Sequence, residues 1–71
     1  MIGMQEGNQI RFTDDEGNHL SYDTIDGDIV DIVNRGEMVV VLVQGRMGNK
    51  QMAIYKETWD GKPNFVGYRA I

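Results

Sequence analysis

Apolar and polar residues alternate in short runs, which recur roughly every ten positions with turn-forming residues between them. No stretch has the i, i+3, i+4, i+7 apolar spacing that indicates an amphipathic helix. We therefore predict a single all-β domain over residues 1–71, with about five to six strands. The simplest architectures are a small antiparallel meander sheet and a barrel of the SH3 or OB type. The strand runs are centred on residues 10–12, 20–24, 29–33, 38–43, 51–57 and 65–71.

Two of these runs depart from simple alternation. In "IVDIV", residues 29–33, the parity of the apolar positions changes at Asp31, which predicts a β-bulge or a strand covered on both faces. The run "MVVVLV", residues 38–43, is apolar at both parities, and an exposed edge of that composition would aggregate. We therefore predict that it is a central strand. In the next run Met52 and Ile54 are expected on one face, with Ala53 and Tyr55 on the other.

The segment "QGRMGNK", residues 44–50, is a glycine-rich stretch that ends in lysine after an aliphatic run. A phosphate-binding loop requires GxxxxGK[ST] followed by a helix. Here Gly45 and Gly48 are too close together, and Gln51 follows Lys50 where Ser or Thr is required. The segment is therefore predicted to be a hairpin connection, with Gly48 or Asn49 in the left-handed conformation. The turn "DDEGN" is expected to use Gly17 in the same way.

The composition limits the available chemistry. The chain has 71 residues, no cysteine and one histidine, so neither a disulfide nor a thiolate or histidine-based metal site is expected, and no cofactor is predicted. A chain of this length buries only about 60% of its unfolded surface, so a well-packed β core or a homo-oligomer must supply stability. No secretory signal or bilayer-spanning apolar run is visible, which favours a cytoplasmic protein without membrane contact.

Charge is unevenly distributed along the chain. Residues 1–31 hold eight acidic side chains against one basic, whereas residues 32–71 hold six basic against three acidic. The acidic spacing fails the EF-hand pattern, although a looser calcium or magnesium site from Asp23, Asp26, Asp28 and Asp31 stays open. Such asymmetry favours binding to another protein or self-association. The residues predicted to bind a protein partner are Asp14, Asp15, Glu16, Asp23, Asp26, Asp28 and Trp59.

Trp59 lies in the turn "ETWDGKPN" and has two interpretations. It is expected to fold back over the end of the β core, and the alternative is an exposed interface anchor.

The basic half offers an alternative partner. Basic residues interleaved with aromatics on a small β fold can bind single-stranded nucleic acid by stacking and phosphate neutralisation. The net charge of −4 opposes this, because such binding depends largely on charge. The residues that would carry it are Arg46, Lys50, Tyr55, Lys56, Lys62 and Arg69.

His19, Ser21 and Asp23 form the only row that resembles a catalytic set. Alternate residues of a strand point outward side by side, whereas a catalytic triad needs convergent geometry. We therefore interpret the row as the polar face of a strand and predict that the protein is not an enzyme.

The order of segments resembles that of the small acidic bacterial proteins of the YrzB-like family. The matching stretches are "IRFTDDEGN" (10–18), "SYDTID" (21–26), "EMVVVLV" (37–43), "MAIYKE" (52–57) and "DGKPNFVG" (60–67). The loop "QGRMGNK" is basic here, whereas this family tends to be acidic there. The resemblance implies a compact β protein and assigns no site. Together these observations predict a non-enzymatic module that binds another protein or itself, and an inhibitor or regulator with an acidic surface is one form of it. The alternatives are nucleic-acid binding and a structural subunit of a homo-oligomer.

Overall fold

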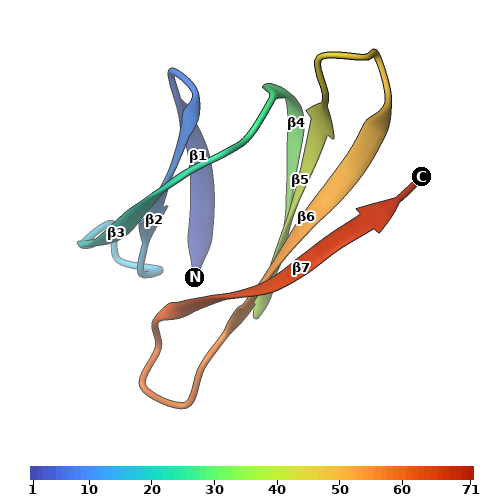
Figure 1. Cartoon of the computed structure of the whole chain (residues 1–71). Coiled ribbons are helices and arrows are strands. Elements are labelled where there is room, and N and C mark those ends of the chain that lie inside the picture. The colour runs from blue at the N-terminus through green and yellow to red at the C-terminus, as the bar shows by residue number, and fades with distance from the viewer.

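The computed structural model describes residues 1–71 and contains two antiparallel β-sheets (Figure 1). One sheet has the order β1-β2-β3 and the other the order β4-β5-β6-β7. The all-β prediction is confirmed, but the barrel does not close and the hairpins do not form one continuous meander sheet. The strands are β1 (Ile2–Glu6), β2 (Gln9–Thr13), β3 (His19–Thr24), β4 (Asp28–Arg35), β5 (Met38–Gln44), β6 (Lys50–Glu57) and β7 (Pro63–Ala70).

The structure has seven strands, so the predicted number of about five to six is wrong. The additional strand is β1, because the chain reverses at Gly7 and Asn8 and β1 pairs with β2. Gly7 has a φ of 64°, a conformation that glycine adopts without steric cost. The sequence concealed this turn because simple alternation along residues 4–12 predicts that Met4 shares the face of Ile10 and Phe12. In the structure Met4 lies opposite Arg11, on the other face of the sheet.

The other local predictions are confirmed. Gly17 and Gly48 both have positive φ, at 89° and 80°. The register of β4 against β5 shifts between Ile29 and Asp31, so Val30 is the extra residue of the expected bulge. Strand β5 is central, with β4 on one side and β6 on the other.

The core lies between the two sheets and depends on one face of β5. Val39, Val41 and Val43 alternate along that strand and are all buried. They face Ile10 and Phe12 of β2, which are also buried and belong to the same apolar cluster. We call the face of each sheet that is turned toward this cluster the inner face, and the opposite face of the four-stranded sheet the outer face.

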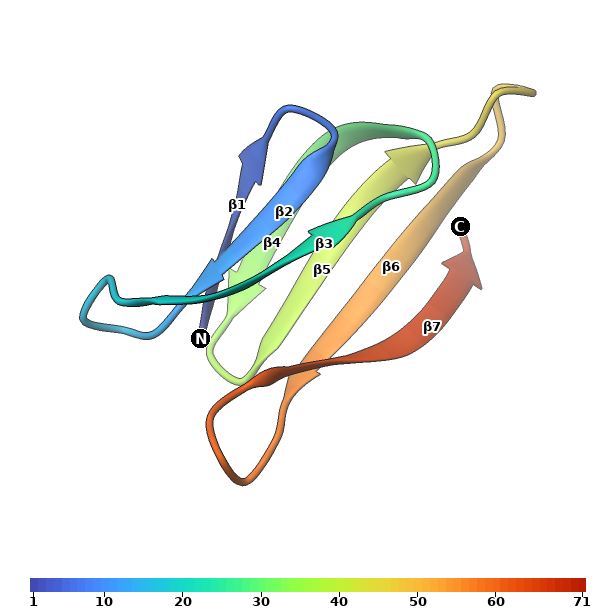
Figure 2. The ribbon, with the colours of Figure 1, turned by 60° about the vertical axis from the view of Figure 1, so that its left-hand side comes forward.

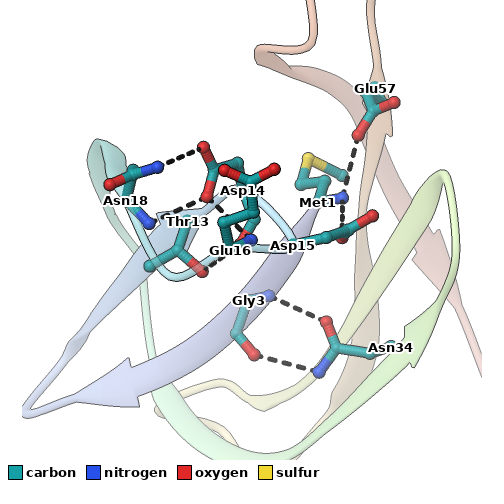
Figure 3. A network of polar contacts seen from close by, with 9 residues as sticks. All are labelled: Met1, Gly3, Thr13, Asp14, Asp15, Glu16, Asn18, Asn34 and Glu57. Atoms are coloured by element: carbon teal, nitrogen blue, oxygen red, sulfur yellow. Dashed lines mark hydrogen bonds and ion pairs between the residues drawn. The ribbon is translucent and has the colours of Figure 1, made fainter.

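The two sheets meet where β1 lies beside β4, as Figure 2 shows. No backbone ladder joins these two strands; the Asn34 side chain connects them instead. The Gly3 N–H donates to Asn34 Oδ1 at 2.7 Å, and Asn34 Nδ2 donates to the Gly3 carbonyl at 3.0 Å (Figure 3). The carboxamide therefore takes the place of a neighbouring peptide group. A Cβ at Gly3 would lie 2.8 Å from Val39 Cγ1, so this close approach requires glycine.

We expect Asn34→Ala to lower the free energy of unfolding by about 1–2 kcal/mol, because both polar groups of Gly3 lose their partner at a partly buried site. Urea unfolding followed by far-UV circular dichroism measures this loss. Asn64→Ala is the matched control, since Asn64 is an exposed strand asparagine, and its effect should stay within about 0.5 kcal/mol. Equal losses in the two variants would contradict the role assigned to Asn34.

Candidate protein-interaction surface

The predicted acidic site begins in the loop between β2 and β3, where Asp14 organises the turn. Its carboxylate accepts hydrogen bonds from the backbone N–H of Glu16 at 3.0 Å and of Asn18 at 2.8 Å (Figure 3). Asn18 Nδ2 donates a third at 3.0 Å. These donors, with Asn18 first, hold the pKa of Asp14 below its ordinary value. Asp14 therefore stabilises its own turn, and a partner would have to compete with these hydrogen bonds for its carboxylate.

Asp15 contacts the amino group of Met1, which lies 3.0 Å from Asp15 Oδ1 and 2.9 Å from Glu57 Oε1 (Figure 3). Hydrogen bonds to Glu57 and then Asp15 raise the pKa of this amino group above its ordinary value, more than desolvation lowers it. The contact ties β1 to the end of β6 and to the loop after β2. Of these three groups, only the Asp15 carboxylate is largely exposed.

Asp23 lies on the inner face of β3, opposite Ile10. Its Oδ2 accepts a hydrogen bond of 2.5 Å from the hydroxyl of Tyr55, a buried residue of β6. Burial, and then this bond, raise the pKa of Tyr55 and keep the phenol protonated. The prediction that the row of His19, Ser21 and Asp23 points outward is therefore wrong for Asp23, whose carboxylate joins the two sheets.

The remaining acidic candidates lie at the two ends of β3. Glu16 is exposed in the loop before that strand, whereas Asp26 is exposed in the connection that follows it and Asp28 is exposed at the start of β4. A six-residue strand spans about 20 Å, so these two groups do not share one surface. The chain brings together no group of His, Cys, Asp and Glu side chains that could hold a metal ion.

Two shallow pockets flank the connection between β3 and β4, with volumes of about 590 and 490 Å³. Asp26, Gly27 and Arg46 line both of them. The larger also includes Tyr68 of β7. Their linings are mostly polar and solvent-exposed, and neither contains a nucleophile beside a general base. Ligand pockets are typically apolar with a few convergent polar groups, a pattern that these pockets lack.

The basic and aromatic candidates for nucleic-acid binding lie on opposite faces of the four-stranded sheet. Tyr55 is 3% exposed and packs against Phe12 with ring centroids 4.8 Å apart, so it belongs to the core. Phe65 lies opposite Tyr55 on β7, which extends the aromatic cluster along the inner face. By strand alternation the exposed side chains of Lys50, Lys56 and Arg69 belong to the outer face, whereas Arg46 and Lys62 lie in the loops before and after β6.

Trp59 is 99% exposed in the loop between β6 and β7. The expectation that it folds back over the core is therefore wrong, because a side chain exposed to this degree makes almost no contact with the core. Its position agrees with the other interpretation, an exposed aromatic available to a partner.

The outer face of the four-stranded sheet carries a set of apolar side chains, and no other element covers it (Figure 1). Its apolar residues come from three neighbouring strands, and all but Met38 lie opposite another apolar residue of the set in the register. Several are half-buried by their neighbours, whereas Val33 and Met38 are 43% and 39% exposed. Contiguous exposed apolar patches of this kind mark interaction surfaces in small proteins. The set consists of Val33, Met38, Val40, Leu42, Met52 and Ile54.

This surface is not predicted from the sequence, although the sequence contains the relevant signal, the apolar residues at both parities of β5. The prediction that Met52 and Ile54 share one face is confirmed by their pairing with Leu42 and Val40. The apolar character of both parities of β5 was used only to place that strand centrally. A pattern of alternation cannot indicate which of two apolar faces the rest of the chain will cover.

No protein-family model, curated protein or solved structure matches this chain. The structure contains no helix that is long and apolar enough to cross a membrane. What is shown is a small all-β domain of two antiparallel sheets, with an outer face that the chain leaves uncovered.

We expect Tyr55→Phe to lower the free energy of unfolding by about 1.5–3 kcal/mol, the range for hydrogen bonds to a charged group. Chemical denaturation of both proteins at neutral pH measures the difference. Tyr22→Phe is the matched control, because Tyr22 is half-exposed and its hydroxyl makes no hydrogen bond within the chain. A loss as large in the control would show that the Asp23 contact is not responsible.

The raised pKa of the Met1 amino group predicts a pH dependence of stability. A folded-state pKa above the unfolded value means that the contribution is present below the ordinary pKa of about 8 and is lost as pH rises through the folded value. The free energy of unfolding should therefore fall above pH ~8. Glu57→Gln should flatten this decline, whereas Glu16→Gln, which changes charge equally, should preserve it. Indistinguishable pH profiles for the two variants would count against the contact.

Proposed function

We propose that this chain is a non-enzymatic β module that works by self-association through the outer face of its four-stranded sheet. The observation that carries the proposal is the uncovered apolar set on that face, centred on Leu42, Val40 and Ile54 of the two middle strands. These side chains lie on regular, hydrogen-bonded strands, so the surface is preformed. A preformed apolar surface binds with little loss of conformational entropy.

The size of the chain supports a second copy as the occupant. The buried apolar cluster comprises nine residues, and the three-stranded sheet covers only the inner face. Small domains without disulfides or metals commonly gain stability by burying further surface in an oligomer. Packing two outer faces together makes a sheet-on-sheet contact of the kind found in β-sandwiches, with the sheets about 10 Å apart.

The other two functions have less support. An inhibitor with an acidic surface needs its carboxylates on one side, but Asp14, Asp15 and Asp23 make contacts within the chain, and Asp26 and Asp28 lie at the opposite end of β3 from the acidic loop. Nucleic-acid binding by stacking needs aromatic and basic groups on one face. Here the aromatic side chains of β6 and β7 lie on the inner face and the basic side chains of the same strands lie on the outer face.

We expect Leu42→Glu to weaken self-association at least about tenfold, since burying a leucine is worth about 1.5–3 kcal/mol and the variant would bury a charge instead. Light scattering and sedimentation across a dilution series measure the dimer dissociation constant. Met47→Glu is the matched control, because Met47 is 93% exposed in the loop between β5 and β6, away from the outer face.

Circular dichroism establishes that both variants remain folded. A wild-type chain that stays monomeric at every concentration would overturn the proposal, and so would a folded Leu42→Glu variant that associates as strongly as the wild type.

A further inference from the structure

We propose that two copies pack through their outer faces about a two-fold axis parallel to the strands, so that Asp31 of each copy pairs with Arg69 of the other. The inference rests on the proposed self-association and adds its geometry and the residues that determine it. It follows from the register of the four strands, which arranges the outer face in rows that run across the sheet.

The first row has an acid at one end and a base at the other. Asp31 lies opposite Leu42, Leu42 opposite Met52, and Met52 opposite Arg69. The row therefore crosses the sheet from β4 to β7 as acidic, apolar, apolar, basic. Residues directly opposite one another in a ladder share a face of the sheet, so the four side chains form one line on the outer face.

The next row is apolar. Val33 lies opposite Val40, and Val40 opposite Ile54, which pairs with Gly67 of β7. Glycine leaves the β7 end of this row without a side chain, so a second sheet can approach closely there.

Consider a two-fold axis that lies in the interface, runs along the strands and passes between β5 and β6. It places each row of one copy against the same row of the other copy, read in the opposite direction. The β4 end of a row then faces the β7 end of the same row in the other copy. Asp31 therefore faces Arg69, and Leu42 faces Met52. Both contacts occur twice in the dimer because the interface is isologous.

The two charged groups are free to make this contact. The only ion pairs within the chain are those of the Met1 amino group, so Arg69 has no carboxylate partner of its own. Asp31 accepts a hydrogen bond only from the backbone N–H of Ile32, at 2.9 Å. Three strand spacings of about 4.8 Å separate β4 from β7, so the two groups of one copy lie too far apart to pair directly. The long arginine side chain can follow the rotation of about 30° that packed sheets adopt.

A two-fold axis across the strands is the main competing geometry. That axis would place the first row of one copy against a third row of the other copy. In this third row Arg35 of β4 lies opposite Met38. Asp31 would then face Arg35, and Arg69 would face Asn64, which lies opposite Lys56 at the β7 end of the third row. The axis along the strands is favoured because it alone supplies Arg69 with a carboxylate.

A charge-exchange experiment tests the geometry on the full chain. Asp31→Arg alone and Arg69→Asp alone should each raise the dimer dissociation constant about tenfold, because each places like charges against one another twice. The double variant Asp31→Arg with Arg69→Asp should return to within about threefold of the wild type. Asp31→Arg with Lys62→Asp has the same net charge of −4 as the wild type and the double variant, but Lys62 lies in a loop, so this control should remain weak.

The outcomes distinguish the geometry of the dimer from self-association itself. Restoration by Arg69→Asp and not by Lys62→Asp supports the axis along the strands. If Arg35→Asp restores dimerisation with Asp31→Arg while Arg69→Asp does not, the axis is overturned, although the outer face remains the interface. If none of these charge changes alters a dimer that Leu42→Glu still disrupts, the Asp31–Arg69 contact is wrong and self-association stands.

Discussion

The fold depends on burying one side of β5, a strand whose residues are apolar at nearly every position. Within the chain only one side of β5 is buried, by the packing of Val39, Val41 and Val43 against Ile10 and Phe12. Val40 and Leu42, on the other side, have neighbours only within their own sheet. The three-stranded sheet packs on the first side and β4, β6 and β7 extend the width of the sheet, so the second side is left uncovered within the chain.

Polar contacts decide how the two sheets are held relative to each other. Asn34 joins β4 to β1 through both polar groups of Gly3, and Tyr55 joins β6 to β3 through Asp23. The Asn34 contact stands where a closed barrel would have a backbone ladder, whereas the Tyr55 contact links the facing sides of the two sheets. Because side-chain contacts at single points replace continuous ladders, the sheets remain separate and β3 and β7 remain edges.

Contacts within the chain also give several of the acidic residues a structural role. Asp14 accepts bonds from its own loop, Asp15 contacts the Met1 amino group, and Asp23 accepts the Tyr55 hydroxyl. In the sequence these residues belong to a region of uniform negative charge. In the structure they are separate elements of the framework, whereas Asp31, which was not among the residues predicted to bind a protein partner, lies beside the uncovered apolar face.

The sequence by itself determined the strand type of the chain, the bulge in β4, the central place of β5 and the turns at Gly17 and Gly48. These features depend on alternation, on β-branched side chains and on the freedom of glycine, all of which are local. It did not determine the turn at Gly7 and Asn8, across which simple alternation continues along residues 4–12, or the exposure of Trp59. Only the tertiary structure decided which face of β5 is covered, that Asp23 points inward, and that basic and aromatic residues lie on opposite faces. The physical reason is that these outcomes depend on which strands pair and pack across long separations in sequence, and alternation alone does not distinguish one apolar face from the other.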